Sequence, residues 1–218
     1  AVTVLAMTGY YTGKNLFTSE IKENSIDYRA AIPLAVGASI GGVAGKMLFE
    51  LIRANSSSTD IAGAVQSMVL GILVIATLIY TVKKSKIKSL KIEKYSVSII
   101  IGLALGLLSS FLGIGGGPFN LAVLFFFFSM ETKEAVQNSL FIILFSQISS
   151  LIYMIVCGKI PQVDMCMLLF MAAGGVAGGV LGKRIGKLID GKTTDKLFVA
   201  LMAVIIGICT YNSVNYLY

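Results

Sequence analysis

Long apolar stretches recur along this chain, and they constrain its fold more than any other feature. Each is about 20 residues long, the length that a helix needs to cross a hydrocarbon layer about 30 Å thick. With 56% apolar and only 13% charged residues, the chain cannot hide this surface as a soluble protein does. The sequence therefore predicts an all-α, polytopic membrane protein. Its uninterrupted spans are Ala31 to Ile52, Ile61 to Val82, Ala135 to Cys157, Met165 to Gly182 and Leu197 to Leu217.

A sixth apolar region, Ser96 to Ser129, is too long for one simple span and has a glycine-rich centre. Four glycines in five positions, Gly113 and Gly115 to Gly117, weaken a helix there because they lack the Cβ constraint. Pro118 suits the first position of a new helix, where its missing N–H costs nothing. We therefore expect a broken helix at membrane depth, which is tolerated where it is buried in protein or lines a wet cavity.

An internal repeat has an offset of 137 residues, because Gly37 corresponds to Gly174 and Lys46 to Lys183. The alignment holds ten identities over the 27 positions from Asp27 to Arg53. We interpret it as a duplication and expect the first copy to lack its opening segment. The predicted organisation is a first repeat over residues 1–82, a basic cytoplasmic linker over 83–95, and a second repeat over 96–218.

The repeated helices carry glycines at every fourth position, which places these glycines on one helix face. Such faces let a second backbone approach closely, as in small-xxx-small packing in membranes. Tight helix packing is the simplest interpretation, and a place at the contact between repeats is the functional one. The predicted packing residues are Gly37, Gly41, Gly45, Gly174, Gly178 and Gly182.

The basic residues choose between two topologies for residues 96–129. If this segment dips in and returns to the same side, 15 of the 18 Lys and Arg residues share that side. If it crosses once, the split is 10 to 8. The positive-inside rule favours the re-entrant topology, with the basic linker in the cytoplasm. Each repeat then has an odd number of crossings, so the two copies run in opposite directions, as in many secondary transporters.

The glycine-rich break has the features of an anion site. A helix starting near Pro118 would point free amide donors and the positive end of its dipole into the cavity. Neutral side chains nearby can add hydrogen bonds, although each could equally bond to a neighbouring helix. The candidate substrate-binding residues are Ser109, Ser110, Gly113, Gly115, Gly116, Gly117, Pro118, Phe119, Asn120, Asn138 and Ser139.

The composition argues against catalysis and against metal binding. The chain has no histidine, and none of its 11 acidic residues is expected near the centre of a span. Cys157, Cys166 and Cys209 lack metal-site spacing and are interpreted as small apolar residues. No catalytic residue, metal site or cofactor is therefore predicted. The net charge of +7 is expected to face anionic lipids and not nucleic acid.

In its glycine-rich segment and in its two repeated glycine helices, the chain resembles the sulfite exporter TauE/SafE family of anion permeases. The resemblance rests on Gly106-x-x-Ser109-x-x-Leu112-Gly113-Ile114-Gly115-Gly116-Gly117-Pro118, on Asn138-Ser139-Leu140, and on the G-x-x-x-G-x-x-x-G-K helix of each repeat. It implies transport of sulfite or an organosulfonate across the bacterial cytoplasmic membrane. Proteins of this family usually carry the glycine-rich motif twice, and this chain carries it once.

The leading hypothesis is thus a multi-pass secondary transporter for a small anion that works by alternating access. Two alternatives stay open: a passive anion channel, and a membrane subunit that scaffolds or regulates a partner without transport. The expected partners are a small anionic substrate and membrane lipids, and a homo-oligomer also stays open.

Overall fold

The computed structural model describes residues 28–55, 59–83, 89–92, 94–113, 117–130, 132–158, 164–188 and 191–217. Across these residues the regular structure is helical, which confirms the predicted fold class. The helices are α2 (Tyr28–Asn55), α3 (Thr59–Lys83), α4 (Tyr95–Leu112), α5 (Gly117–Phe128), α6 (Thr132–Val156), α7 (Met165–Leu188) and α8 (Gly191–Leu217).

Six of these helices are long and apolar enough to cross a membrane, and α5 is a shorter apolar helix of 12 residues. At a rise of about 1.5 Å per residue, α5 is about 18 Å long and too short to span. The chain is a multi-pass membrane protein, as its apolar stretches predicted.

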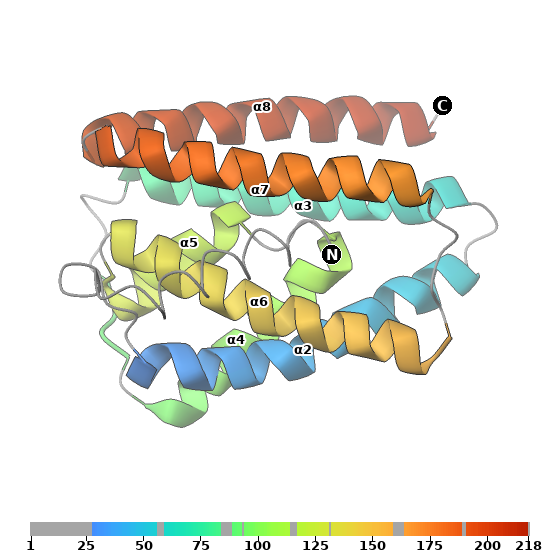
Figure 1. Cartoon of the computed structure of the whole chain (residues 1–218), viewed down its shortest axis with the longest axis horizontal. Coiled ribbons are helices and arrows are strands. Elements are labelled where there is room, and N and C mark those ends of the chain that lie inside the picture. The colour runs from blue at the N-terminus through green and yellow to red at the C-terminus, as the bar shows by residue number, and fades with distance from the viewer. Residues whose placement is uncertain are drawn as a thin grey trace.

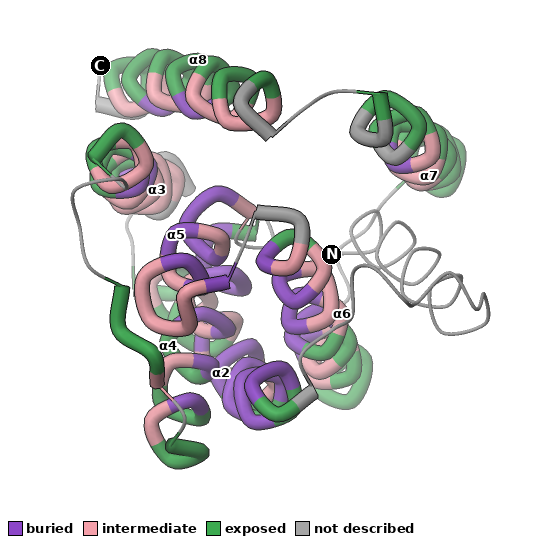
Figure 2. The backbone as a smooth tube through the Cα atoms, turned by 90° about the vertical axis from the view of Figure 1, so that its left-hand side faces the viewer, coloured by how far each residue is buried: buried purple, intermediate pink, exposed green. Residues whose placement is uncertain are grey.

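A first group of packed helices contains α2, α4, α5 and α6 (Figure 1). Helix α3 packs against α8, and α7 lies apart from α3 (Figure 2). Buried residues concentrate in the first group, whereas α7 and α8 are largely exposed (Figure 2). Their exposed apolar side chains suit a lipid environment, where no water penalises them.

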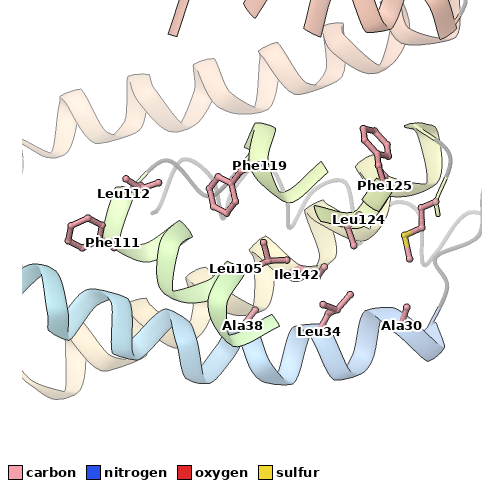
Figure 3. Packing of buried hydrophobic residues seen from close by; sticks show 12 residues of the cluster. Ala30, Leu34, Ala38, Leu105, Phe111, Leu112, Phe119, Leu124, Phe125 and Ile142 are labelled. Atoms are coloured by element: carbon pink, nitrogen blue, oxygen red, sulfur yellow. The ribbon is translucent and has the colours of Figure 1, made fainter. Parts of the chain in front are cut away.

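The hydrophobic core runs between α2, α4, α5 and α6 (Figure 3). Leu34 of α2, Leu124 of α5 and Ile142 of α6 are almost completely buried in it. Leu105 and Leu112 of α4 lie in the same cluster. This core holds α4 and α5, the helices on either side of the glycine-rich break, against α2 and α6.

Helices α2 and α4 approach each other backbone to backbone along their glycine faces. A Cβ atom added at Gly37, Gly41 or Gly45 would lie 2.0 to 2.2 Å from carbonyl oxygens of α4. The contact is reciprocal, because a Cβ atom added at Gly102 or Gly106 of α4 would lie 2.2 Å from carbonyl oxygens of α2. Side chains at these positions would hold the two helices apart.

The two helices of this pair run parallel and come from different predicted repeats. The order of the contacts shows the direction, since Gly37 faces Ile99 and Gly45 faces Leu107. Among the described residues, no neighbour lies within 4 Å of a Cβ atom placed at Gly174, Gly178 or Gly182. Packing at these three positions of α7 therefore stays a prediction.

Candidate functional site

The predicted break in the sixth apolar region is present. Helix α4 ends at Leu112, and Gly113 adopts a left-handed conformation with φ of 70°. The N–H of Gly113 donates to the carbonyl oxygen of Ser109 at 3.1 Å, which closes the helix end. Glycine adopts this conformation without a steric penalty. Helix α5 begins at Gly117, with Pro118 as its second residue.

The segment returns to the end of the molecule at which it began. Leu90 and Ile92, just before α4, donate their N–H groups to the carbonyl oxygens of Phe126 and Phe127 at 2.7 and 3.0 Å. These phenylalanines lie at the end of α5. The start of α4 and the end of α5 are therefore adjacent, so the two helices form a hairpin around the break.

Helix α3 holds the broken end of α4 in place. The side-chain amide of Gln66 donates to the carbonyl oxygens of Phe111 and Leu112, at 3.1 and 2.6 Å. The last four carbonyls of a helix have no partner within it, so a buried helix end needs a donor from elsewhere. Gln66 supplies that donor, and no motif in the sequence singled it out.

The predicted polar residues are buried in the protein. Ser109, Asn120 and Asn138 are at most 1% exposed, and Ser110 and Ser139 are also buried. Pro118 and Phe119 are buried in the first turn of α5. Two further candidates, Gly115 and Gly116, lie outside the described residues.

The polar residues occupy two levels along α6. Asn120 lies nine residues before Ser129, and Asn138 lies eight residues after Met130, so both are about equally far from the α5–α6 turn. Consecutive helices that fold back on each other bring such positions to similar depth, and α5 and α6 do pack together. The first level is therefore formed by Asn120, Asn138 and Ser139.

The second level lies farther along α6, where Ser110 of α4 meets two serines. The hydroxyl oxygen of Ser110 is 2.8 Å from that of Ser150 and 3.4 Å from that of Ser146. Gly42 of α2 packs against these serines, since a Cβ atom at Gly42 would lie 2.8 Å from the Ser146 hydroxyl oxygen. Three helices thus enclose a small neutral polar cluster.

Three amide side chains in this region have unused hydrogen-bonding atoms. Asn120 is completely buried, and neither its oxygen nor its nitrogen has a hydrogen-bond partner. The Oδ1 of Asn138 and the Nε2 of Gln147 are also buried without partners. The Nδ2 of Asn138 donates to the carbonyl oxygen of Glu134 at 2.9 Å. A buried, unsatisfied polar group costs about 1 to 3 kcal/mol, so Asn120, with both of its polar atoms unpaired, is the strongest indication of a ligand site among them.

Four of the site's residues were absent from the sequence prediction: Gln66, Ser146, Gln147 and Ser150. On α6 a usable signal existed, because residues 139, 146 and 150 recur at helical spacing and fall on one face, with 138 and 147 on either side of it. That pattern continues the predicted Asn138-Ser139 pair for three further turns. Gln66 had no comparable signal, since it stands alone in an apolar span.

A cavity of about 440 Å³ lies between α3, α4 and α5, next to this cluster. Its lining is apolar apart from Thr77 and Tyr80, and the Thr77 hydroxyl donates to the carbonyl oxygen of Leu73 on its own helix. It includes Phe119 but none of the unpartnered amides. Such a cavity suits an apolar chain, so the polar cluster is the better candidate for binding an anion.

The electrostatic character of the site comes from neutral donors and a helix end. The first N–H groups of α5, including that of Phe119, have no partner within the helix, and the N-terminal end of the helix carries partial positive charge. Within the described part of the chain, no group of His, Cys, Asp and Glu could hold a metal ion. The sequence-based prediction of an anion site here stays a prediction.

Comparisons with known proteins show the family of the chain. A family model described as "Sulfite exporter TauE/SafE" matches residues 2–208. The "Probable membrane transporter protein YunE" of Bacillus subtilis (strain 168) is 26% identical over 161 residues, which cover 69% of this chain and 59% of that protein. The match thus spans less than two thirds of this relative. No solved structure matches the chain significantly.

Proposed function

Because the chain belongs to the sulfite exporter TauE/SafE family, we propose that it forms the anion-binding part of a membrane permease. The proposed substrate is sulfite or a small organosulfonate, carried across the bacterial cytoplasmic membrane. The relative YunE is named as a probable membrane transporter, which supports transport as the activity. The observation that carries the proposal is Asn120, fully buried beside the break with both polar atoms unpaired.

The proposed binding mode uses hydrogen bonds from neutral groups. A charged side chain is costly at membrane depth, whereas the first turn of α5 and the amide of Asn120 offer donors without net charge. Each hydrogen bond to a charged acceptor contributes about 1.5 to 3 kcal/mol. Several such donors would offset much of the dehydration of a small oxyanion.

The transport mechanism that we propose is alternating access. The α4–α5 hairpin returns to its starting end, so a repeat containing it has three full crossings besides the hairpin. Two copies with an odd number of crossings run in opposite directions. Inverted repeats can expose one central site first to one side of the membrane and then to the other.

The experiment that tests the site compares Asn120→Leu with the wild type in the purified full-length protein. We expect calorimetric titration with sulfite and with methanesulfonate to show binding to the wild type and none to Asn120→Leu. Ser110→Ala should weaken binding only partly, because Ser146 and Ser150 remain. Thr77→Val is the matched control, since Thr77 lies in the apolar cavity and bonds its own helix.

If Asn120→Leu binds these anions as tightly as the wild type, the substrate site does not lie at the break. A channel would instead be indicated by anion flux in proteoliposomes that follows voltage and shows neither saturation nor counterflow. A full-length protein that binds none of these anions would favour the scaffold alternative.

A further inference from the structure

The apolar cavity between α3, α4 and α5 extends along these helices. Its lining runs from Ile100 to Leu108 on α4 and from Phe119 to Phe127 on α5. Eight steps of helix at about 1.5 Å each make a length of about 12 Å. The hydrocarbon core of a membrane is about 30 Å thick, so the cavity is slightly shorter than one leaflet of the bilayer.

The cavity reaches the surface between α3 and α4. Ala76 of α3 and Ile100 and Ala104 of α4 line it and are exposed. Its inner wall is formed by α5, where Phe119 and Ala122 are buried. Figure 2 shows α5 between α3 and α4. A molecule dissolved in the surrounding lipid can therefore enter from the side.

The lining and the volume of the cavity favour an acyl chain as its occupant. Water in a buried site needs two to four polar partners, and the Thr77 hydroxyl already donates to its own helix. A packed helix is about 10 to 12 Å across and would fill about 1,000 Å³ over a length of 12 Å. The cavity offers about 440 Å³, which is too small for a helix.

One end of the cavity lies beside the basic linker. Phe126 and Phe127 line this end, and their carbonyl oxygens accept the N–H groups of Leu90 and Ile92. Lys91 stands between these two linker residues and is exposed. The extended segment around Lys91 is thus fixed to the rim of the cavity.

Helix α3 brings a second lysine to the same end. The Tyr80 ring lies edge-on to that of Phe126, with 5.8 Å between the ring centroids. Lys83 follows Tyr80 by three residues, so it lies about one turn farther along α3, and it is exposed. Tyrosine is enriched where a membrane meets water, and lysine suits the headgroup layer just beyond it.

The local charge at this end is positive. The linker over residues 83–95 and the α5–α6 turn over residues 129–134 together hold seven lysines and three acidic residues, an excess of four positive charges. Basic clusters next to membrane spans attract anionic lipid headgroups. The cavity therefore combines an apolar channel with a cationic rim.

We propose that this cavity binds one acyl chain of an anionic phospholipid, whose headgroup lies against Lys83 and Lys91. The chain passes Tyr80 and Phe126 and extends toward the glycine-rich break. The headgroup lies on the predicted cytoplasmic side, because the linker lies there. This lipid holds α3 against the α4–α5 hairpin.

The test uses the purified protein in nanodiscs of phosphatidylcholine that contain a trace of photoreactive phosphatidylglycerol. The photoreactive group sits at the end of one acyl chain, and peptide mapping locates the crosslinks. We expect them at the inner end of the cavity, on Leu73, Leu108 or Phe119. Phosphatidylcholine with the same photoreactive chain should label these residues at least fivefold more weakly.

Two variants separate the acyl-chain site from the headgroup site. Ala104→Phe fills the opening and should reduce the labelling at least fivefold, whereas Ala203→Phe, at an exposed alanine of α8, should leave it unchanged. A lysine near the surface contributes about fivefold to the binding of an anionic lipid, so Lys91→Gln should weaken labelling by about that factor. Arg53→Gln removes the same charge at the far end of α2 and should have no effect.

Circular dichroism checks that the variants keep the wild-type helicity, which is expected because Ala104 and Lys91 are exposed. Crosslinks spread evenly over the exposed faces of α7 and α8 would overturn the proposal. Wild-type labelling in Ala104→Phe would also overturn it. Equal labelling by the two phospholipids would show an unselective lipid surface in place of an anionic-lipid site.

Discussion

Substitution of Gly41 by alanine is the sharpest test of the α2–α4 contact. The added Cβ atom would lie 2.0 Å from the carbonyl oxygen of Leu103 and 2.8 Å from the backbone nitrogen of Leu107. Ordinary contact begins at 3.4 Å, so the helices must separate by about 1.4 Å at this point. Every atom met is backbone, so no rotamer change can relieve the clash. The separation also loosens the neighbouring contacts of Gly37 and Gly45.

The expected cost follows from two opposing terms. Overpacking costs about 1 to 3 kcal/mol. We expect a cost at the upper end of this range, because the clash is with backbone atoms. Alanine returns about 1 kcal/mol through its higher helix propensity. The net loss in the free energy of unfolding is therefore about 2 kcal/mol. For a chain of this size that corresponds to a fall in Tm of about 4 to 8 °C.

Thermal unfolding in detergent, followed by far-UV circular dichroism, measures this loss. Gly71→Ala is the matched control, because its Cβ atom would meet only Cys209 at an ordinary 3.5 Å, and it should unfold at or slightly above the wild-type temperature. If Gly41→Ala and Gly71→Ala unfold at the same temperature, the close approach of α2 and α4 is not a feature of the protein in solution.

Four further outcomes are expected. Gln66→Leu should lower the unfolding free energy by about 1 to 3 kcal/mol, measured by the same assay, because two buried carbonyls at the end of α4 lose their donor; a wild-type value would show that this cap contributes nothing. Asn120→Leu should raise the Tm, because it replaces a buried unpaired amide by an apolar group, and it should also remove anion binding. A lowered Tm would show that the Asn120 amide does have hydrogen-bond partners. Cysteines at Ser89 and Thr193 should resist an impermeant reagent in intact cells, and labelling of either one sinks the re-entrant topology. Gly116→Val should abolish the binding of sulfite, measured by calorimetry, because it distorts the break. If binding is retained, the break serves helix packing alone.

The sequence predicted the helices well because span length and glycine content are local properties. The uninterrupted stretches became α2, α3, α6, α7 and α8, and the glycine-rich centre separated α4 from α5. The membrane leaves few alternatives to such helices, because each backbone polar group must be satisfied within the protein.

Pairing between helices could not be predicted in the same way. The two glycine faces have the same sequence pattern, yet a Cβ atom at Gly41 would meet a neighbouring backbone and one at Gly178 would meet none of the described residues. Which helix covers a face depends on distant segments that the local pattern does not encode. The role of Gln66 escaped prediction for the same reason, since its acceptors lie 45 and 46 residues away.

The interdigitated backbones of α2 and α4 restrict how this protein can move. Two helices joined by side chains can slide, because rotamers adjust, whereas the carbonyl oxygens of Ile99, Leu103 and Leu107 sit in recesses that only glycine provides. A shift of one residue would bring Ile40 or Gly42 to the place of Gly41 and turn the two glycine faces away from each other. The pair is therefore expected to move as one rigid unit, and a conformational change must occur at other helix contacts.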